Sequence, residues 1–174
     1  MANFSKHIEP LIQKEGGYLD HTVKGDRGGR TYAGIASASN PDWAGWQYLE
    51  GGEHPPKELV HNLYKRKYWD VMMLDDVKHE IVASVLFSSC VLSGHRTATR
   101  LAQTVVQATV DGAMGPNTMK AINAEDPEKF ALAFAIARIA RFSRIVQKNK
   151  TQRKFFLGWV NRCVRELAEA GDIT

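Results

Sequence analysis

The organisation of this chain is set by two stretches, EGGYLD at residues 15–20 and DRGGRTYAGI at residues 26–35. Before them, apolar residues recur at the spacing of one helical face, which predicts an amphipathic helix over residues 4–15. Gly16 can end this helix, and the glycine-rich residues 16–40 predict an irregular segment with a small β piece. The glutamate that begins the first stretch therefore falls at the end of an apolar helical face.

The rest of the chain predicts a mainly α fold of six to eight helices. Asn3 can cap the first helix, although Pro10 should kink it or shift its start. Residues 81–92 are apolar on most sides and predict a central buried helix. Further helices are expected from Pro41 to about Gly51, from Pro56 to about Asp70, from Arg96 to Gln107, from Pro116 past Ile122, from Pro127 to about Gln147, and from about Arg153 to Ala170.

Positive charge is concentrated near the C-terminus. The chain has 174 residues and a net charge of +4, and residues 138–165 contain nine Lys and Arg with no Asp or Glu. Arg138, Arg141, Arg144 and Lys148 recur along the long predicted helix as a basic stripe. Such a stripe is either a solvated face or a contact with anionic wall or outer-membrane components. No base-reading motif accompanies it, so we expect no nucleic acid partner.

Several classes of protein are disfavoured by what the sequence lacks. Cys90 and Cys163 form no metal or redox motif, and Cys90 lies in an apolar run typical of a buried free thiol. Residues 1–15 contain no uninterrupted apolar run of the kind found in signal peptides, and no stretch has the length of a membrane span. The turn at Asp111-Gly112 lacks the other ligands of a metal loop, so we predict no metal and no cofactor.

The first two stretches suit the cleavage of glycosidic bonds. That reaction needs a proton donor at the leaving oxygen and a second group on the other side of the sugar. An apolar surrounding disfavours the ionised form of a carboxyl, which makes Glu15 the candidate proton donor. Asp26 and Thr31 can together orient an attacking water, and Asp20 competes with Asp26 for that role. The alternative is that Glu15 is a surface residue and that the Asp and Gly residues form ordinary turns.

Five separated motifs resemble glycoside hydrolase family 108, whose members are peptidoglycan-cleaving N-acetylmuramidases of phage endolysins and bacterial prophages. They are EGGYLD, the whole of residues 26–35, Tyr68-Trp69-Asp70, DGAMGPNT at residues 111–118 and FLGWVNR at residues 156–162. The last two resemble the peptidoglycan-binding region that accompanies the family. The resemblance implies a lysozyme-like catalytic region at residues 1–94 and a helical peptidoglycan-binding region at residues 95–174, packed as one globular unit.

The resemblance also assigns roles to residues. The catalytic acid of the family falls on Glu15, and the order Glu, Asp, Thr is similar to that of phage-type lysozymes, which points to Asp26 and Thr31 as its companions. We assign substrate binding to Tyr18, Asp20, Tyr68 and Trp69, although Tyr68 and Trp69 could equally be core residues. The sequence departs from the family where an Asp is expected at Ser88 and an Asn at Leu92.

The resulting prediction is a hydrolase of the β-1,4 bond between N-acetylmuramic acid and N-acetylglucosamine in peptidoglycan. With water activated by Asp26 and Thr31, the reaction would be inverting, whereas a separation of about 5 Å between the Glu15 and Asp26 carboxyls would favour a retaining reaction. The alternatives are a lytic transglycosylase, which needs only the acid, and a non-enzymatic wall-binding or secretion-assisting protein. We expect synthesis in the cytoplasm without a signal peptide and action on the periplasmic cell wall after holin-type or other release. Nothing in the sequence indicates an oligomeric state.

Overall fold

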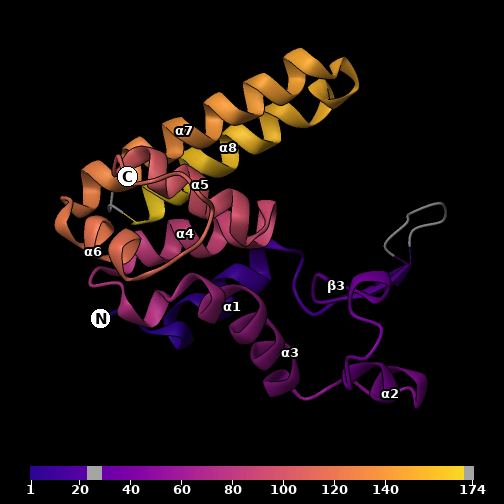
Figure 1. The fold of residues 1–174 in the computed structure, drawn as a ribbon. Coiled ribbons are helices and arrows are strands. Elements are labelled where there is room, and N and C mark those ends of the chain that lie inside the picture. The colour runs from indigo at the N-terminus through magenta and orange to yellow at the C-terminus, as the bar shows by residue number, and fades with distance from the viewer. Residues whose placement is uncertain (23–28, 171–174) are drawn as a thin grey trace. The chain divides into compact units, whose positions relative to one another are not determined.

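The computed structural model describes residues 1–22 and 29–170. These residues form two compact units, one of residues 3–67 and one of residues 1–2 together with 68–174 (Figure 1). The described residues are mainly α-helical, with one small antiparallel sheet, which confirms the predicted fold class. Among them, no helix is long and apolar enough to cross a membrane.

The unit of residues 3–67 combines short helices with the sheet. Its elements are α1 (Phe4–Lys14), β1 (Asp20–Thr22), β2 (Arg30–Tyr32), β3 (Ile35–Ala36), α2 (Gly45–Glu50) and α3 (Lys57–Tyr64). The strands lie in the order β1-β2-β3, and each pair is antiparallel. The side chain of Asn3 accepts a hydrogen bond from the N–H of Ser5, which confirms the predicted cap. The helix continues through Pro10 to Lys14.

Strands β2 and β3 are joined by a two-residue β-hairpin turn. Tyr32 pairs with Ile35, so only Ala33 and Gly34 connect the strands. Both have positive φ, +48° and +76° respectively, as a type I′ turn requires. Tyr32 is buried beneath this turn and stacks on Trp43 with ring centroids 6.0 Å apart. The aromatic pair belongs to the buried core of this small unit.

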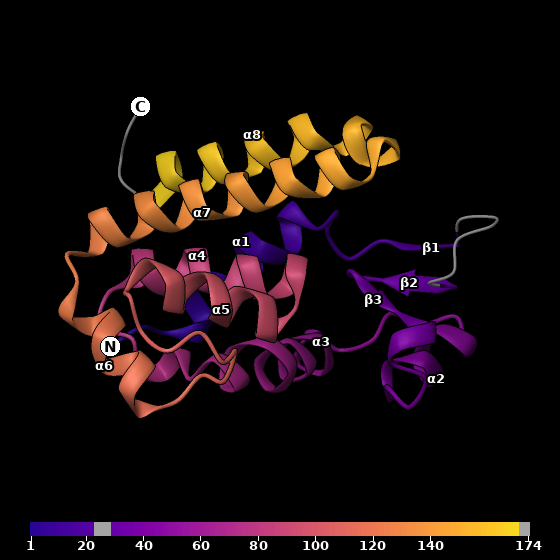
Figure 2. The ribbon, with the colours of Figure 1, turned by 45° about the horizontal axis from the view of Figure 1, so that its top comes forward.

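The second unit is a helical assembly around α4. Its helices are α4 (Glu80–Ser93), α5 (His95–Val105), α6 (Pro116–Ala124), α7 (Pro127–Lys148) and α8 (Arg153–Ala170). The long helices α7 and α8 form an antiparallel hairpin (Figure 2). Helix α4 contacts α5, α7 and α8, and its side chains are buried on most sides, as predicted for the central helix. Cys90 on α4 is a buried free thiol, and burial raises its pKa to about 12.

The units divide at a different place from the predicted regions. The compact units separate between Lys67 and Tyr68, whereas the predicted boundary between residues 94 and 95 divides regions of different function and stays a prediction. The physical reason is the burial of α4, whose apolar sides are covered by the C-terminal helices. Two helices are also shorter than predicted. The helix expected from Pro41 begins only at Gly45, and the helix expected to reach Asp70 ends at Tyr64, where a π-helical turn follows.

A buried ion cluster ties α8 to α4 and α7. The carboxylate of Glu166 accepts hydrogen bonds from Arg138, from the hydroxyl of Ser88 and, at 2.9 Å, from Arg162. Burial opposes ionisation of Glu166, but Arg138, Ser88 and Arg162 together outweigh it and hold the pKa of this carboxyl below its ordinary value. Ser88, one of the two departures from the family pattern, is therefore a partner within the core. Leu92, the other, packs on the apolar cluster between α7 and α8.

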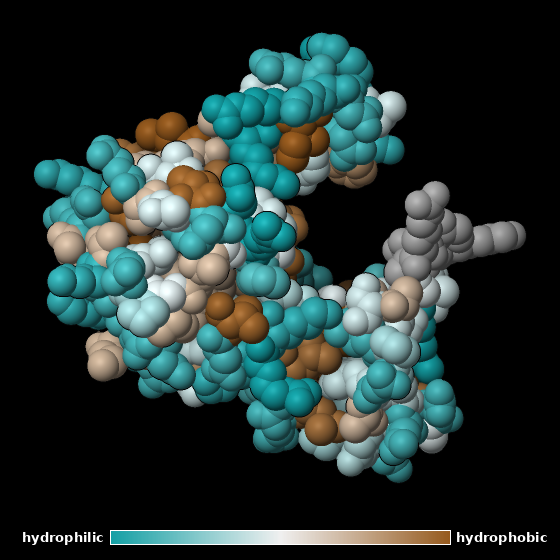
Figure 3. Space-filling model, viewed as in Figure 1, coloured by the Kyte–Doolittle hydropathy of each residue, from teal (hydrophilic) through white to brown (hydrophobic). Residues whose placement is uncertain are grey.

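The predicted basic stripe needs one correction. Arg138 is only 2% exposed and forms a buried ion pair with Glu166, so it is not part of a surface stripe. Exposed cations instead gather where α7 gives way to α8, at Lys148, Lys150 and Arg153. Figure 3 shows hydrophilic side chains over that end of the hairpin.

Candidate active site

Glu15 is the residue at which α1 ends. The N–H of Gly17 bonds to the carbonyl of Ile12 at 2.9 Å, and that of Gly16 bonds to the carbonyl of Gln13 at 3.2 Å. These two bonds form a Schellman motif, in which Glu15 is the C-cap residue. The reversal requires the positive φ angles of Gly16 and Gly17, +103° and +73°. The Glu-Gly-Gly sequence is therefore the helix terminator itself, and it fixes where the glutamate side chain leaves the backbone.

The surroundings of Glu15 are apolar on the helix side and open on the glycine side. Ile8, Leu11 and Ile12 of α1 are buried, and Glu15 is half-buried. A methyl group placed on Gly16 would meet no heavy atom of the described residues within 4 Å. Glu15 thus follows a packed helix face and precedes a glycine that has open space beside it.

The hairpin turn lies against the base of the Glu15 side chain. A Cβ placed on Gly34 would lie 3.5 Å from the Cβ of Glu15 and 2.6 Å from the hydroxyl of Tyr64. That hydroxyl donates a hydrogen bond of 3.0 Å to the carbonyl of Ala33. Because only glycine fits this gap, Gly34 allows the end of α1, the hairpin turn and the end of α3 to meet at one point.

The sheet separates the two groups that were candidates for activating water. Thr31 pairs with His21 and with Ala36, whereas Asp20 pairs with Tyr32. Since side chains alternate along a strand, Thr31 and Asp20 project from opposite faces of the sheet. Asp26, the other candidate, lies outside the described residues.

Asp20 is held by a neighbouring cation. Its two carboxylate oxygens accept hydrogen bonds of 2.9 and 2.7 Å from the guanidinium of Arg30. That hydrogen bonding lowers the pKa of Asp20 in spite of a smaller, opposing effect of burial. Arg30 also donates to the carbonyl of Leu49 at 3.2 Å, which anchors the pair to the end of α2. The geometry gives Asp20 an ionised carboxylate whose oxygens are already engaged.

Tyr18, predicted to bind substrate, takes part in a polar cluster on the surface of the same unit. Its hydroxyl donates to Glu9 at 2.9 Å and lies 3.0 Å from Nε2 of His61, while the ammonium of Lys57 stands 4.8 Å from its ring centre. Burial raises the pKa of Tyr18, and the adjacent Glu9 carboxylate raises it further. Burial opposes ionisation of Glu9, but the hydrogen bonds from Tyr18 and Lys57 leave its pKa below the ordinary value.

The two aromatic residues after α3 lie in the other unit and differ in exposure. Trp69 is fully buried, packs edge-on against Phe87, and donates its N–H to the carboxylate of Asp75 at 2.7 Å. The core alternative is therefore the one that its surroundings favour, because a buried indole offers no face to a sugar. Tyr68 is half-buried.

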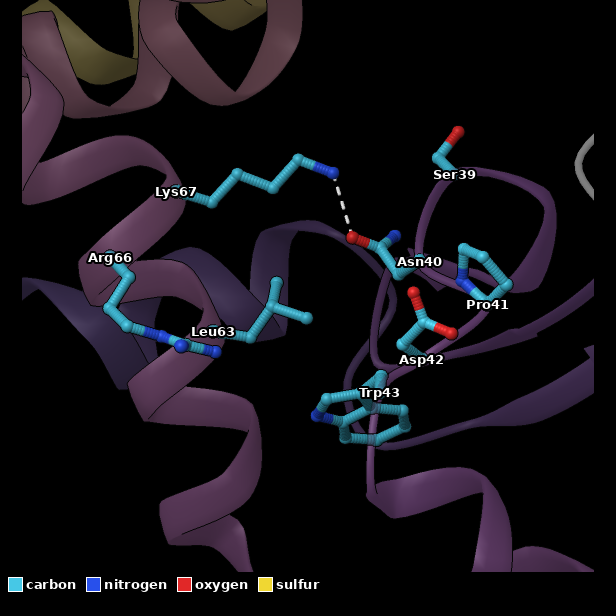
Figure 4. Close-up of a pocket in the computed structure, with 8 residues that line it drawn as sticks. All are labelled: Ser39, Asn40, Pro41, Asp42, Trp43, Leu63, Arg66 and Lys67. Atoms are coloured by element: carbon cyan, nitrogen blue, oxygen red, sulfur yellow. Dashed lines mark hydrogen bonds between the residues drawn. The ribbon is translucent and has the colours of Figure 1, made fainter.

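A hollow that the sequence did not predict lies in the unit of Glu15. It has a volume of about 370 Å³ and is bounded by residues 39–43 on one side and by Leu63, Arg66 and Lys67 on the other (Figure 4). Lys67 crosses it to donate to Oδ1 of Asn40 at 2.7 Å. The sequence Asn40-Pro41-Asp42 could have indicated this hollow. We interpreted it as a helix start, but it forms a turn before α2. Within the described ranges, no group of three or more His, Cys, Asp and Glu could hold a metal ion.

Comparison with known proteins covers nearly the whole chain. The family model described as glycosyl hydrolase 108 matches residues 8–94, and that described as a predicted peptidoglycan domain matches residues 96–164. The solved structure of Brucella abortus SagA is similar over 96% of this chain and 92% of that chain, with 25% identity and a TM-score of 0.73. The match confirms the predicted lysozyme-like fold. No curated protein sequence matches the chain.

Proposed function

We propose that this chain, which belongs to the glycosyl hydrolase 108 family, is an N-acetylmuramidase with Glu15 as its general acid. The family makes the chain a glycoside hydrolase, and the peptidoglycan domain at residues 96–164 makes peptidoglycan its polymer. Our finer proposal is that the bond cleaved is the β-1,4 bond from N-acetylmuramic acid to N-acetylglucosamine.

The observation that carries the proposal is the placement of Glu15. The Schellman motif presents this carboxyl at the end of a buried helix face, with open space over Gly16 for a sugar. A general acid must lie where its carboxyl can reach the leaving oxygen of the sugar. The close approach of Gly34 supports the proposal further, because a Cβ at that position would lie 3.5 Å from the Cβ of Glu15.

For the second half of the reaction, we favour water held by Thr31 and Asp26 over water activated by Asp20. Thr31 projects from the opposite face of the sheet to Asp20, so the two cannot serve one water molecule directly. Both oxygens of Asp20 are occupied by Arg30. We therefore assign Asp20 the role of holding β1 against β2, and propose an inverting reaction that uses Thr31 and Asp26.

We propose that the hollow of Figure 4 binds a further part of the glycan. The exposed Asp42 and Arg66 offer hydrogen-bond acceptors and donors around it, and the exposed Pro41 supplies an apolar surface. This mixture is what a sugar ring requires, because hydroxyl groups alternate with apolar C–H faces.

The test of the proposed function is the chemistry of the products from purified peptidoglycan. An inverting muramidase releases fragments with N-acetylmuramic acid at a reducing end, and that residue is initially in the α configuration. Mass spectrometry, with NMR at early times, would show these ends. Fragments ending in 1,6-anhydromuramic acid would identify a lytic transglycosylase, and reducing N-acetylglucosamine ends would identify cleavage of the other glycosidic bond; either result overturns the proposal.

A further inference from the structure

A second hollow lies within the helical unit, in the part of the chain that matches the peptidoglycan domain. It has a volume of about 310 Å³ and is formed by one face of α5, the loop after it and the middle of α7. We call it the arginine groove; its lining residues are Thr97, Arg100, Leu101, Thr104, Val110, Arg141 and Arg144. All of them fall inside residues 96–164.

The arginine groove is strongly cationic. Three of its lining residues are arginines and none is acidic. Within the described part of the chain, the guanidinium groups of Arg100, Arg141 and Arg144 make no ion pair. Three cations around one hollow repel one another, and an anionic ligand would remove that repulsion.

The nearest acidic group does not neutralise the groove. Asp111 follows Val110 and lies close enough to Arg100 for its pKa to be lowered slightly by that charge. The larger causes are hydrogen bonds to Oδ1, which accepts from the N–H of Ala113 at 2.8 Å and from Gln103 at 2.7 Å. The carboxylate of Asp111 therefore stabilises the loop after α5 through its hydrogen bonds, and the arginine groove stays cationic.

The remaining lining residues narrow the chemistry of the ligand. Leu101 and the exposed Val110 give the groove an apolar floor, Thr97 adds a hydroxyl, and the hydroxyl of Thr104 donates to the carbonyl of Arg100 at 2.8 Å. Guanidinium groups bind carboxylates through paired hydrogen bonds, and an apolar floor suits methyl groups. Carboxylates spaced by small apolar side chains are the composition of the peptide stems of peptidoglycan, which carry free carboxylates between alanine residues.

We propose that the arginine groove binds the carboxylates of peptidoglycan stem peptides and so holds the enzyme on glycan strands that still carry stems. This inference rests on peptidoglycan being the substrate, as set out under the proposed function. It assigns the glycan backbone to the unit of Glu15 and the peptide stems to the helical unit. A phosphate-rich polymer would use the arginines but would gain nothing from Leu101 and Val110.

The test measures binding separately from cleavage. The full chain carrying Glu15→Gln is used throughout, so that no substrate is consumed and a failure of catalysis cannot obscure the result. Into this background go Arg100→Gln, Arg141→Gln and Arg144→Gln together. The matched control is Lys148→Gln, Lys150→Gln and Arg153→Gln, which removes the same charge from exposed positions outside the groove. Thermal unfolding of both proteins shows whether each is folded.

Binding is measured by sedimentation with intact peptidoglycan and with amidase-treated glycan that has lost its stems. We expect the groove variant to bind intact peptidoglycan at least about tenfold more weakly, the control to change less than about twofold, and neither to change on stem-free glycan. A synthetic stem peptide with free carboxylates should compete, and its carboxamide form should not.

Three results would overturn the proposal. Equal losses in the groove variant and the control would mean general attraction to a polyanion. An equal loss on stem-free glycan would place the glycan itself in the groove. Competition by inorganic phosphate as strong as that by the stem peptide would point to a phosphate polymer or a lipid headgroup.

Discussion

Each unit of this protein holds one notable glutamate, and their surroundings are opposite. Glu15 sits at a helix end, half-buried, between an apolar face and open space above glycine. Glu166 sits inside a helical assembly, 3% exposed, and accepts hydrogen bonds from two arginines and a serine. A carboxylate that is paired in this way stabilises a fold and stays ionised to lower pH than an unpaired one.

The difference extends to the units around them. Residues 3–67 contain a helix stop and a hairpin turn that only glycine makes easily, whereas residues 68–174 consist mainly of long regular helices. Irregular backbone positions reactive groups, and regular helices supply a rigid surface for binding. We therefore expect substitutions in the first unit to act mainly on the reaction rate, and those in the second to act on stability or affinity.

The largest change in stability should come from Glu166→Gln. Removing this carboxylate leaves Arg138 buried without its counterion, which should cost about 3–5 kcal/mol of unfolding free energy. The rate of the molecules that remain folded should stay near that of the wild type. Urea unfolding beside the exposed-site variant Glu169→Gln measures the first effect, and activity per folded molecule measures the second.

The same variant predicts a change in pH dependence. Because Arg138 lowers the folded-state pKa of Glu166, the stabilisation is complete above the unfolded pKa of about 4.3 and is lost as pH falls through the lower folded value. Glu166→Gln should therefore flatten the acid side of the stability curve. An unchanged acid side would show that Glu166 is not the group that titrates there.

A smaller effect, on both rate and stability, is expected from Gly34→Ala. The new methyl group would approach the Tyr64 hydroxyl to 2.6 Å and stand against Glu15, on a backbone with φ +76°. We expect a loss of about 1–3 kcal/mol in stability and roughly tenfold in kcat. Gly52→Ala is the control, because its φ is +80° and no heavy atom of the described residues lies within 4 Å of the added methyl. If both variants lose the same activity, the contact with Glu15 has no role.

The smallest effects should distinguish the two faces of the sheet. Thr31→Val keeps the β-branched shape and removes the hydroxyl, so kcat should fall about tenfold if Thr31 holds the water. Asp20→Asn should change kcat by less than about threefold, because Asp20 engages Arg30 on the other face. Steady-state kinetics on soluble glycan fragments measures both. The reverse order of effects would assign the water to Asp20.

Most helices could be predicted from sequence because their ends carry local signals. Asn3 caps α1, Gly94 follows α4, and Pro127 begins α7, as the capping rules anticipate. Glu15 could be placed for the same reason, since a helix face and a glycine pair are features of neighbouring residues. The contact of Gly34 with Glu15 could not be predicted, because it depends on how distant elements pack.

The wrong assignments also have a physical cause. Arg138 was predicted at the surface because arginine usually lies there, and its counterion Glu166 is 28 residues away in the sequence. The boundary of the compact units after Lys67 could not be predicted, because α4 is apolar on most sides, a property that does not reveal which neighbours cover it. The hollow beside Asn40 was missed because the same residues can start a helix or form a turn.

The most direct test of the central claim compares Glu15→Gln with Glu53→Gln, an exposed glutamate of the same unit. Both substitutions keep the side-chain shape and remove one ionisable group. Rates on purified peptidoglycan should fall by at least about 100-fold in Glu15→Gln, with stability unchanged, and by less than about twofold in Glu53→Gln. A Glu15→Gln enzyme that retains more than about a third of the wild-type rate would contradict the assignment of Glu15 as the general acid.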